Sequence, residues 1–251
     1  MIKRIVLLTI FGLALSAQAQ SIKIAAASDL RFALDEIIKV YKNQASGANI
    51  EVIYGSSGNA YTQIAHGAPF DLYFSADIVY ATKLKTAGFA LTYPTIYAIG
   101  RIVLWSTSLD VSKGLKVLTE KQNIKIATAN PEHAPYGQRS VEALKYYQLY
   151  EKVEKHLIFG ENISQAAQFC LTGNADAGLL ALSLVLSPSM SNQGKYYLID
   201  DHSHRPLEQA FVILKHAKDN KLAFAFADFI TTKPARSIFE KYGFTLPQKN
   251  E

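Results

Sequence analysis

The chain alternates short apolar runs with longer segments whose apolar residues recur every three to four positions, and this alternation is the strongest constraint on its fold. The run at 22–27 is typical of a buried strand, and a helix is expected to begin at Ser28-Asp29. One face of that helix gathers its apolar residues: Leu30, Leu34, Ile37, Val40 and Tyr41. A strand at 50–54, a helix through 61–65 and a strand at 71–75 follow. This β-α-β-α-β order predicts a mainly parallel sheet with helices on both faces.

The same alternation starts again in the middle of the chain. The expected strands there cover 99–105, 124–129, 177–181 and 209–214, and the expected helices cover 141–147, 162–172, 222–230 and 234–242. A chain of 251 residues that is 49% apolar can build two modest hydrophobic cores. We therefore predict an α/β protein with two lobes, between which the chain crosses and returns. Residues 20–101 and 205–251 would form one lobe, and residues 102–204 the other.

Residues 1–19 have the layout of a secretory signal peptide. Lys3 and Arg4 precede an apolar run at 5–15, and Ala17-Gln18-Ala19 supplies small residues in an A-x-A arrangement. The apolar run is shorter than the roughly 20 residues that a membrane-spanning helix needs. We expect a mature chain that begins near Gln20. An uncleaved amphipathic or anchoring helix is the alternative.

The net charge and the single cysteine exclude several classes of protein. Lys and Arg number 26 against 21 Asp and Glu, a surplus of +5, and removal of Lys3 and Arg4 reduces it to 24 − 21 = +3. The chain has no basic run interleaved with aromatic residues, so nucleic acid is not an expected partner. Cys170 is the only cysteine, which excludes an intramolecular disulfide and a cysteine-rich metal site.

The sequence does not indicate an enzyme. It lacks G-x-S-x-G, H-E-x-x-H, P-loop and G-x-G-x-x-G motifs. Gly55-Ser56-Ser57-Gly58 superficially resembles a nucleophile loop, but His66, the nearest histidine, would lie two turns along the following helix. His202-Ser203-His204 could supply two metal ligands, although such a pair beside Asp200 and Asp201 is more often solvated surface. An enzyme or sensory domain on this scaffold remains the alternative from another class.

Serines at the starts of two predicted helices suggest an anion site. Ser28 and Ser57 each follow a predicted strand and open a helix. Helix N-termini carry unpaired N–H groups and a partial positive charge, so several that converge can bind an anion without Lys or Arg. The alternative is plain N-capping, in which each serine satisfies only its own helix.

Five segments in order resemble the periplasmic molybdate-binding protein (ModA) family of ABC importers, over essentially the whole mature chain. They are 25–28 (AAAS), 55–58 (GSSG), 67–77 (GAPFDLYFSAD), 130–137 (NPEHAPYG) and 241–244 (KYGF). The resemblance implies a class II periplasmic binding protein, whose two lobes close over a tetrahedral oxyanion such as molybdate or tungstate. It also implies a monomer without a cofactor, located in the periplasm, that serves an inner-membrane ABC permease and its ATPase. A protein for sulfate, phosphate or another tetrahedral oxyanion is the alternative.

The resemblance also implies a ligand shell. Ser28 and Ser57 would bind through hydroxyl and backbone N–H groups, and Tyr136 and Ile163 through their backbone. Enteric members have a tyrosine where this chain has Ala181, and alanine where it has Tyr136. This chain therefore resembles the other branch of the family, in which a tyrosine of the P-E-H loop supplies the hydroxyl.

Asp29 is a second departure from the pattern. A carboxylate about 4 Å from a negative charge costs on the order of 4 kcal/mol at an effective dielectric constant near 20. We therefore expect the Asp29 side chain to turn outward at the helix start, while its backbone N–H reaches the ligand. A carboxyl that faced the ligand would favour a protonated oxyanion such as hydrogen phosphate, whereas a shell of donors alone selects a fully deprotonated dianion.

Overall fold

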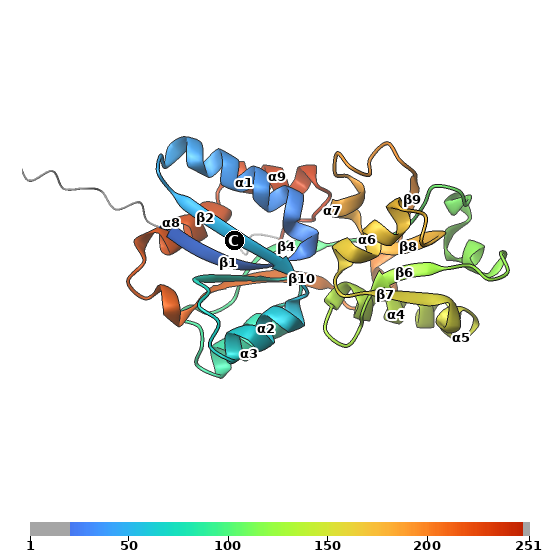
Figure 1. Cartoon of the computed structure of the whole chain (residues 1–251), viewed down its shortest axis with the longest axis horizontal. Coiled ribbons are helices and arrows are strands. Elements are labelled where there is room, and N and C mark those ends of the chain that lie inside the picture. Colours follow the sequence, from blue (N-terminus) through green and yellow to red (C-terminus); the bar gives the residue numbers. More distant parts are fainter. Residues whose placement is uncertain (1–20, 248–251) are drawn as a thin grey trace, which may run out of the picture.

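The computed structural model describes residues 21–247 and places two sheets side by side, each flanked by helices (Figure 1). The predicted signal peptide lies outside the described residues. The first lobe contains β1 (Ser21–Ala27), η1 (Ser28–Leu30), α1 (Arg31–Gln44), β2 (Asn49–Gly55), α2 (Ser57–Ala65), β3 (Leu72–Ser75), α3 (Ile78–Thr86), β4 (Thr95–Gly100), β10 (Leu207–Ile213), η5 (Lys215–Ala217), α8 (Lys221–Ile230) and α9 (Lys233–Lys241). The second lobe contains β5 (Ile102–Ser106), η2 (Val111–Thr119), β6 (Ile126–Ala129), α4 (Pro135–Tyr146), α5 (Tyr150–Val153), η3 (Glu154–His156), β7 (Leu157–Gly160), α6 (Ile163–Leu171), β8 (Ala177–Ala181), α7 (Leu182–Val185), β9 (Lys195–Leu198) and η4 (Asp201–Ser203). The predicted two-lobed α/β architecture is confirmed.

The first sheet has the strand order β2-β1-β3-β10-β4. Helices α1, α8 and α9 cover one face, and α2 and α3 cover the other (Figure 1). Strand β1 lies inside this sandwich, with Ile24, Ala25 and Ala26 buried. Burial on both faces explains why its sequence is a continuous apolar run rather than an alternation of apolar and polar residues.

Each sheet is mainly parallel, as predicted, because four of its five strands run in one direction and one strand, β10 or β5, runs against them. Strand β1 runs parallel to β2 and β3, and β6 runs parallel to β7 and β8. Strands β10 and β5 pair antiparallel with both of their neighbours. These two strands enter their sheets from the other lobe, without the α-helical crossover that makes consecutive strands parallel.

The expected single strand at 99–105 is in fact two strands in different sheets. Strand β4 ends at Gly100, which pairs with Leu207 of β10, whereas β5 begins at Ile102, which pairs with Ala181 of β8. The chain therefore crosses between the sheets at Arg101, and it returns in the segment between β9 and β10. The predicted domain boundaries, after residue 101 and before residue 205, remain a prediction.

The carboxyl ends of the parallel strands point toward the junction of the lobes. Strands β1 and β2 are followed there by the starts of α1 and α2, and β6 and β7 by the starts of α4 and α6 (Figure 1). In open α/β sheets this edge is where ligands bind. Within 21–247 no helix has the length and apolarity needed to cross a bilayer.

Candidate functional site

A small cavity lies at the junction of the lobes, beyond the carboxyl ends of β1 and β2. The space within it that solvent can occupy is about 10 Å³, room for about one water molecule, so a larger anion enters only if the walls move apart. The lining residues are Ala27, Ser28, Asp29, Gly55, Ser56, Ser57, Ala76, Ala134, Pro135, Tyr136 and Ile163. All five residues that the sequence suggested for the ligand shell are therefore brought together, although they come from both lobes.

Four helix starts meet at this cavity. Ser28 and Asp29 lie in the turn that opens α1, Ser57 is the first residue of α2, Pro135 of α4 and Ile163 of α6. The first N–H groups of each helix have no partner within it, and the helix dipoles add partial positive charge. No Lys, Arg or His is among the lining residues in the part of the chain that the structure describes. Within residues 21–247, the positive potential of the cavity therefore comes from backbone N–H groups and hydroxyls, and its one charged lining side chain is Asp29.

The two predicted serines do not cap their helices. Ser56 is the N-cap of α2, since its Oγ accepts a hydrogen bond from Asn59 N, and no side chain caps the start of η1 or α1. Ser57 Oγ instead accepts from Ala76 N at 3.0 Å, which leaves its own proton for a further acceptor. This contradicts the capping alternative for Ser57.

Ser28 joins the two lobes at one wall of the cavity. Its hydroxyl donates to Asn162 Oδ1 at 3.1 Å and accepts from Ser164 N at 3.3 Å, while Ser164 Oγ donates to Ser28 O at 2.9 Å. Ser28 also does not cap its own helix. The hydroxyl therefore already has protein partners from the second lobe, and a ligand would share or replace them.

The outward orientation predicted for Asp29 is wrong. Its side chain is buried, with Oδ2 accepting from Tyr136 Oη at 3.1 Å and from Gln209 Nε2 at 2.5 Å. Burial is the main cause that raises the pKa of Asp29 to about 6, and the hydrogen bonds from Gln209 and Tyr136 act in the opposite direction. The carboxyl turns inward because β10 and α4 supply donors there.

Gln209 is the site residue that sequence reasoning missed. It is fully buried in β10, and besides Asp29 it contacts Tyr97, whose hydroxyl donates to Gln209 Oε1 at 2.8 Å. The available signal was a buried-type strand, LEQAFVI, that carries an amide in its apolar run. A buried amide needs partners, so such a residue marks a place where other polar groups gather.

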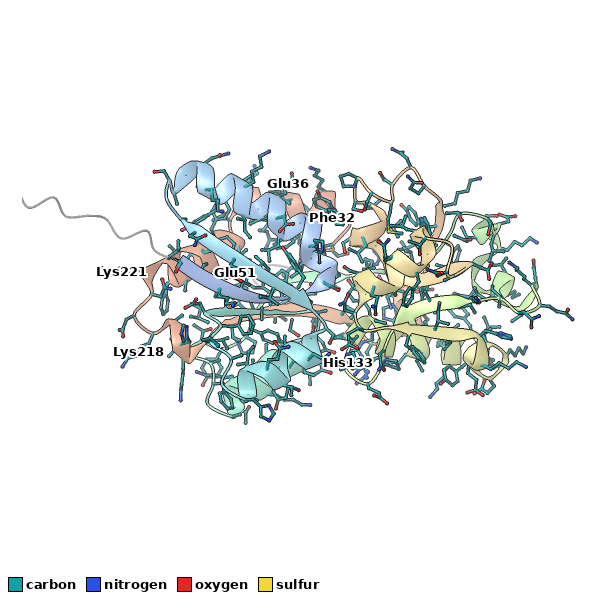
Figure 2. The ribbon with its side chains drawn as sticks, in the orientation of Figure 1. Phe32, Glu36, Glu51, His133, Lys218 and Lys221 are labelled. Atoms are coloured by element: carbon teal, nitrogen blue, oxygen red, sulfur yellow. The ribbon has the colours of Figure 1, made fainter. Side chains whose placement is uncertain are left out.

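The start of α2 contacts the loop before α4 closely. Gly58 N donates to His133 O at 2.8 Å, and the His133 ring Nδ1 lies 2.9 Å from Ser56 Oγ. Figure 2 shows His133 at the junction of the lobes, near α2. A Cβ at Gly58 would lie 2.7 Å from His133 O, a contact that backbone atoms do not tolerate. Glycine is therefore needed for this approach of the lobes.

Gly58→Ala should weaken anion binding by about tenfold, or about 1.4 kcal/mol. The added methyl group holds the lobes apart, while the first lobe itself is unchanged. Isothermal titration of the purified variant measures the effect. The matched control is Gly55→Ala, because a Cβ at that cavity-lining position meets nothing within 4 Å. Equal affinities of the two variants would contradict the steric argument.

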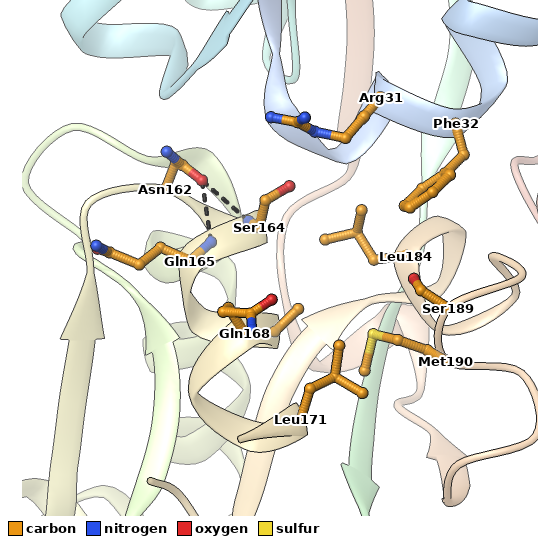
Figure 3. Close-up of a pocket in the computed structure, with 11 residues that line it drawn as sticks. Arg31, Phe32, Asn162, Ser164, Gln165, Gln168, Leu171, Leu184, Ser189 and Met190 are labelled. Carbon is orange, nitrogen blue, oxygen red and sulfur yellow. Dashed lines mark hydrogen bonds between the residues drawn. The ribbon is translucent and has the colours of Figure 1, made fainter. Parts of the chain in front are cut away.

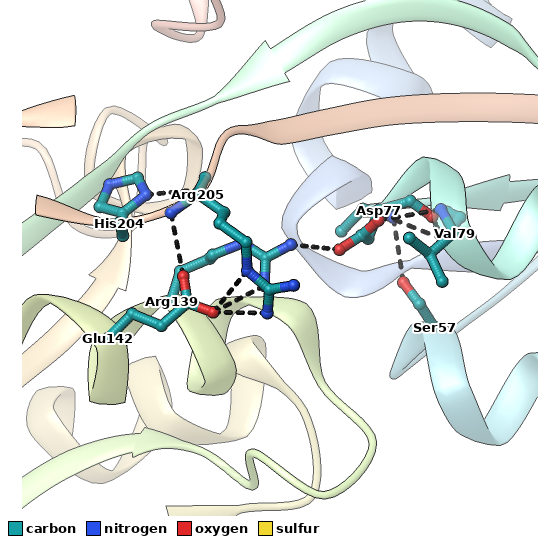
Figure 4. Close-up of polar contacts among 9 residues, drawn as sticks. Ser57, Asp77, Val79, Arg139, Glu142, His204 and Arg205 are labelled. Carbon is teal, nitrogen blue, oxygen red and sulfur yellow. Dashed lines mark hydrogen bonds and ion pairs between the residues drawn. The ribbon is translucent and has the colours of Figure 1, made fainter. Parts of the chain in front are cut away.

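A buried ion pair also joins the lobes. Arg139 of α4 contacts Asp77, which precedes α3, and their side chains are only 4% and 8% exposed (Figure 4). Asp77 Oδ1 also accepts from Val79 N at 2.9 Å. Arg139 lies near Glu142, which in turn holds Arg205 through contacts at 2.6 and 2.9 Å. The pair connects α4 of the second lobe with the start of α3 in the first lobe, so it forms only when the lobes meet.

A larger groove lies beside the cavity, between α1 of the first lobe and α6 and α7 of the second (Figure 3). Its space of about 1030 Å³ is open to solvent, and its walls mix Arg31 and three amide side chains with Phe32, Leu184 and Met190. The contacts of Ser28 with Asn162 and Ser164 stand between the groove and the small cavity.

His66 and His204, two of the histidines considered in the sequence, do not support the nucleophile or metal alternatives. His204 Nδ1 lies 2.8 Å from Arg205 O, and His66 Nδ1 lies 2.7 Å from Thr62 O, so neither ring is turned toward a serine nucleophile. The histidine that does contact a serine is His133, whose Nδ1 lies 2.9 Å from Oγ of Ser56, the N-cap of α2. Among residues 21–247, no three or more His, Cys, Asp or Glu side chains are grouped to hold a metal ion.

The match to known families covers nearly the whole described chain. Residues 22–245 match the family described as bacterial extracellular solute-binding protein. The chain belongs to this family. Within it, the molybdate-binding protein ModA of Rhodobacter capsulatus is 34% identical, over 94% of this chain and 92% of that protein. The predicted resemblance to the ModA family is thereby confirmed.

Two further members of the family support the assignment. A putative ABC transporter substrate-binding lipoprotein of Bacillus subtilis is 32% identical, over 92% of this chain and 88% of its own length. The structure of the Azotobacter vinelandii periplasmic molybdate-binding protein aligns with a TM-score of 0.85 at 30% identity, over 90% of this chain and 100% of that one.

Proposed function

We propose that the protein captures molybdate, and also tungstate, between its lobes and delivers the anion to an ABC importer. The observation that carries this proposal is the cavity at four helix starts, which no Lys, Arg or His of residues 21–247 lines. Such a site attracts negative charge through fixed N–H and O–H dipoles, which stay in place when water is excluded. The named function of the relatives is consistent with it.

The ligand shell that we propose comprises Ser28, Asp29, Ser57, Tyr136 and Ile163. Ser57 would donate its free hydroxyl proton, and the backbone N–H groups at the starts of α2, α4 and α6 would complete the shell. Because the residues come from both lobes, the anion is enclosed when they meet and released when they part. Binding needs no counter-charge from a side chain.

The rest of the proposal concerns the setting in which the protein acts. We infer that it is a monomeric periplasmic protein, exported by a cleaved signal peptide, that has no catalytic activity and no cofactor. Its partners would be the oxyanion, an inner-membrane permease and the ATPase of that permease. The protein would have two domains. One comprises residues 20–101 and 205–251, and the other comprises residues 102–204.

Phosphate is the second candidate, and one observation favours it. Asp29 lines the cavity and its Oδ1 has no hydrogen-bond partner among the residues that the structure describes, so this oxygen can accept a hydrogen bond from a protonated oxyanion. Sulfate, which carries no proton at neutral pH, gains nothing from this acceptor.

Thermal melting of residues 20–251 with each of the four anions separates these candidates. A ligand at 100 times its Kd adds about 2.7 kcal/mol to the free energy of unfolding, so a tight ligand raises the Tm by several degrees. We expect large shifts for molybdate and tungstate, and shifts for sulfate and phosphate no larger than that of sodium chloride at equal ionic strength. Equal small shifts for all four anions would refute the proposal, and a shift with phosphate alone would favour the second candidate.

A further inference from the structure

The carboxyl group of Asp29 uses its two oxygens very differently. Both hydrogen-bond donors that reach it, Tyr136 Oη and Gln209 Nε2, bind Oδ2. Oδ1 is equally buried but has no partner in the described chain. Asp29 lines the proposed anion cavity, and among the lining residues within 21–247 its side chain is the one that, when ionised, can only accept hydrogen bonds.

Within residues 21–247, the groups around Asp29 provide no cation to balance its charge. The β4 and α4 elements face it with the hydroxyls of Tyr97 and Tyr136, and β10 with the Gln209 amide. From α7, the Ser183 hydroxyl donates to Asp29 O at 2.8 Å, and α6 presents the Ser164 hydroxyl to the neighbouring Ser28. The nearest cation in sequence, Arg31, lies over the Tyr54 ring at 5.0 Å instead. An ionised Asp29 beside a bound dianion would therefore face uncompensated repulsion.

We propose that Asp29 Oδ1 and the bound oxyanion share one proton, which makes Asp29 the residue that senses the protonation state of the ligand. This inference rests on the proposed function, because it assigns a role within the same site. A fully deprotonated dianion brings no proton, so Asp29 takes one from solvent and Oδ1–H donates to an anion oxygen. An oxyanion with its own hydroxyl provides the proton, and the ionised carboxylate accepts it.

The proposal predicts the direction in which the affinity for molybdate changes with pH. Burial holds the pKa of Asp29 near 6, so below that pH the carboxyl is already protonated and the affinity for molybdate does not change with pH. Above pH 6 each bound dianion must bring in a proton, and the affinity falls by up to tenfold per pH unit. Any binding of a protonated oxyanion would show no such fall in affinity, because that ligand brings the shared proton itself.

Titration calorimetry at pH 8 in two buffers with different ionisation enthalpies counts the protons directly. We expect the whole mature protein to take up close to one proton for each molybdate bound, and the molybdate Kd to rise between pH 6 and pH 9. Asp29→Asn is the matched variant, because it keeps an acceptor for Tyr136 and Gln209 and replaces the shared proton with a permanent amide donor. Its proton uptake should be zero and its Kd independent of pH, with tighter binding than the original protein at pH 9.

The possible outcomes separate this inference from the function on which it rests. Molybdate binding without proton uptake, at a Kd that does not change from pH 6 to pH 9, overturns the role of Asp29 and leaves the proposed function standing. No binding of any oxyanion at any pH overturns the function itself. The proton count on the unsubstituted protein decides the matter even if Asp29→Asn does not fold.

Discussion

Arg139→Met should weaken anion binding by at least about a hundredfold, or about 3 kcal/mol. Arg139 and Asp77 are both buried, and they face each other from different lobes. Removal of the guanidinium leaves the Asp77 carboxylate without its counter-charge when the lobes meet, and loss of one partner from a buried pair costs about 3–5 kcal/mol. If the lobes part, Asp77 regains water, so the cost falls on lobe closure more than on the folding of either lobe.

Two measurements distinguish an effect on lobe closure from an effect on folding. Calorimetric titration with molybdate measures the first, and thermal melting of the anion-free protein measures the second. Arg205→Met is the matched control, because Arg205 also binds a carboxylate, that of Glu142, but its side chain is 70% exposed. Exposed pairs contribute about 1 kcal/mol or less, so the control should bind molybdate almost normally.

A double variant tests the origin of the effect. Asp77→Asn combined with Arg139→Met removes both charges and keeps an acceptor for Val79 N. We expect it to recover most of the lost affinity, because an uncharged pair leaves no buried charge. If the double variant binds as weakly as Arg139→Met, the unpaired carboxylate is not the cause.

The local parts of the site could be predicted from the sequence. An apolar run followed by Ser28, or by Gly55-Ser56-Ser57, predicts the end of a strand and the start of a helix from a few neighbouring residues. The structure has a strand end and a helix start at both places. Parallel strands bring their carboxyl ends to one edge, so the convergence of these segments follows from the β-α-β order. That convergence is why all five predicted residues line one cavity.

The interior of the site depends on contacts that no local pattern contains. Asp29 turns inward because Gln209 and Tyr136 are there, and Gln209 lies 180 positions away along the chain. Considered alone, a carboxylate at a helix start is expected to face solvent, where it suits the helix dipole. The prediction of one strand at 99–105 was wrong for a related reason. Both halves of this segment are apolar, but distant strands pair with them in two different sheets.

Elements with weak periodicity were also missed. Strand β9 (Lys195–Leu198) has all four residues exposed, and helix α3 (Ile78–Thr86) buries only Ala81 and Leu84. An edge strand and a helix with a narrow buried stripe give little contrast between apolar and polar positions. Both are held by their neighbours in the fold, which a single sequence does not display.

Tyr136→Phe should weaken molybdate binding by about 10- to 100-fold, or about 1.5–3 kcal/mol. The Tyr136 hydroxyl reaches Asp29 across the junction of the lobes, in a space that a Cβ at Gly100 would fill. The bond forms only when the lobes meet, so its loss lowers the stability of the anion-bound form and leaves the open form unchanged. Any direct bond from the hydroxyl to the anion would be lost in addition.

Tyr54→Phe is the matched control for this last measurement. It also removes a tyrosine-to-carboxylate hydrogen bond, from Tyr54 Oη to Asp35 Oδ1 at 2.6 Å, but both residues belong to the first lobe. A bond within one lobe does not depend on closure, so calorimetry should give a Kd within about twofold of the original. Equal affinities of Tyr136→Phe and Tyr54→Phe would show that the hydroxyl of Tyr136 contributes neither to closure nor to the ligand shell, and would leave its backbone as the only contact with the anion.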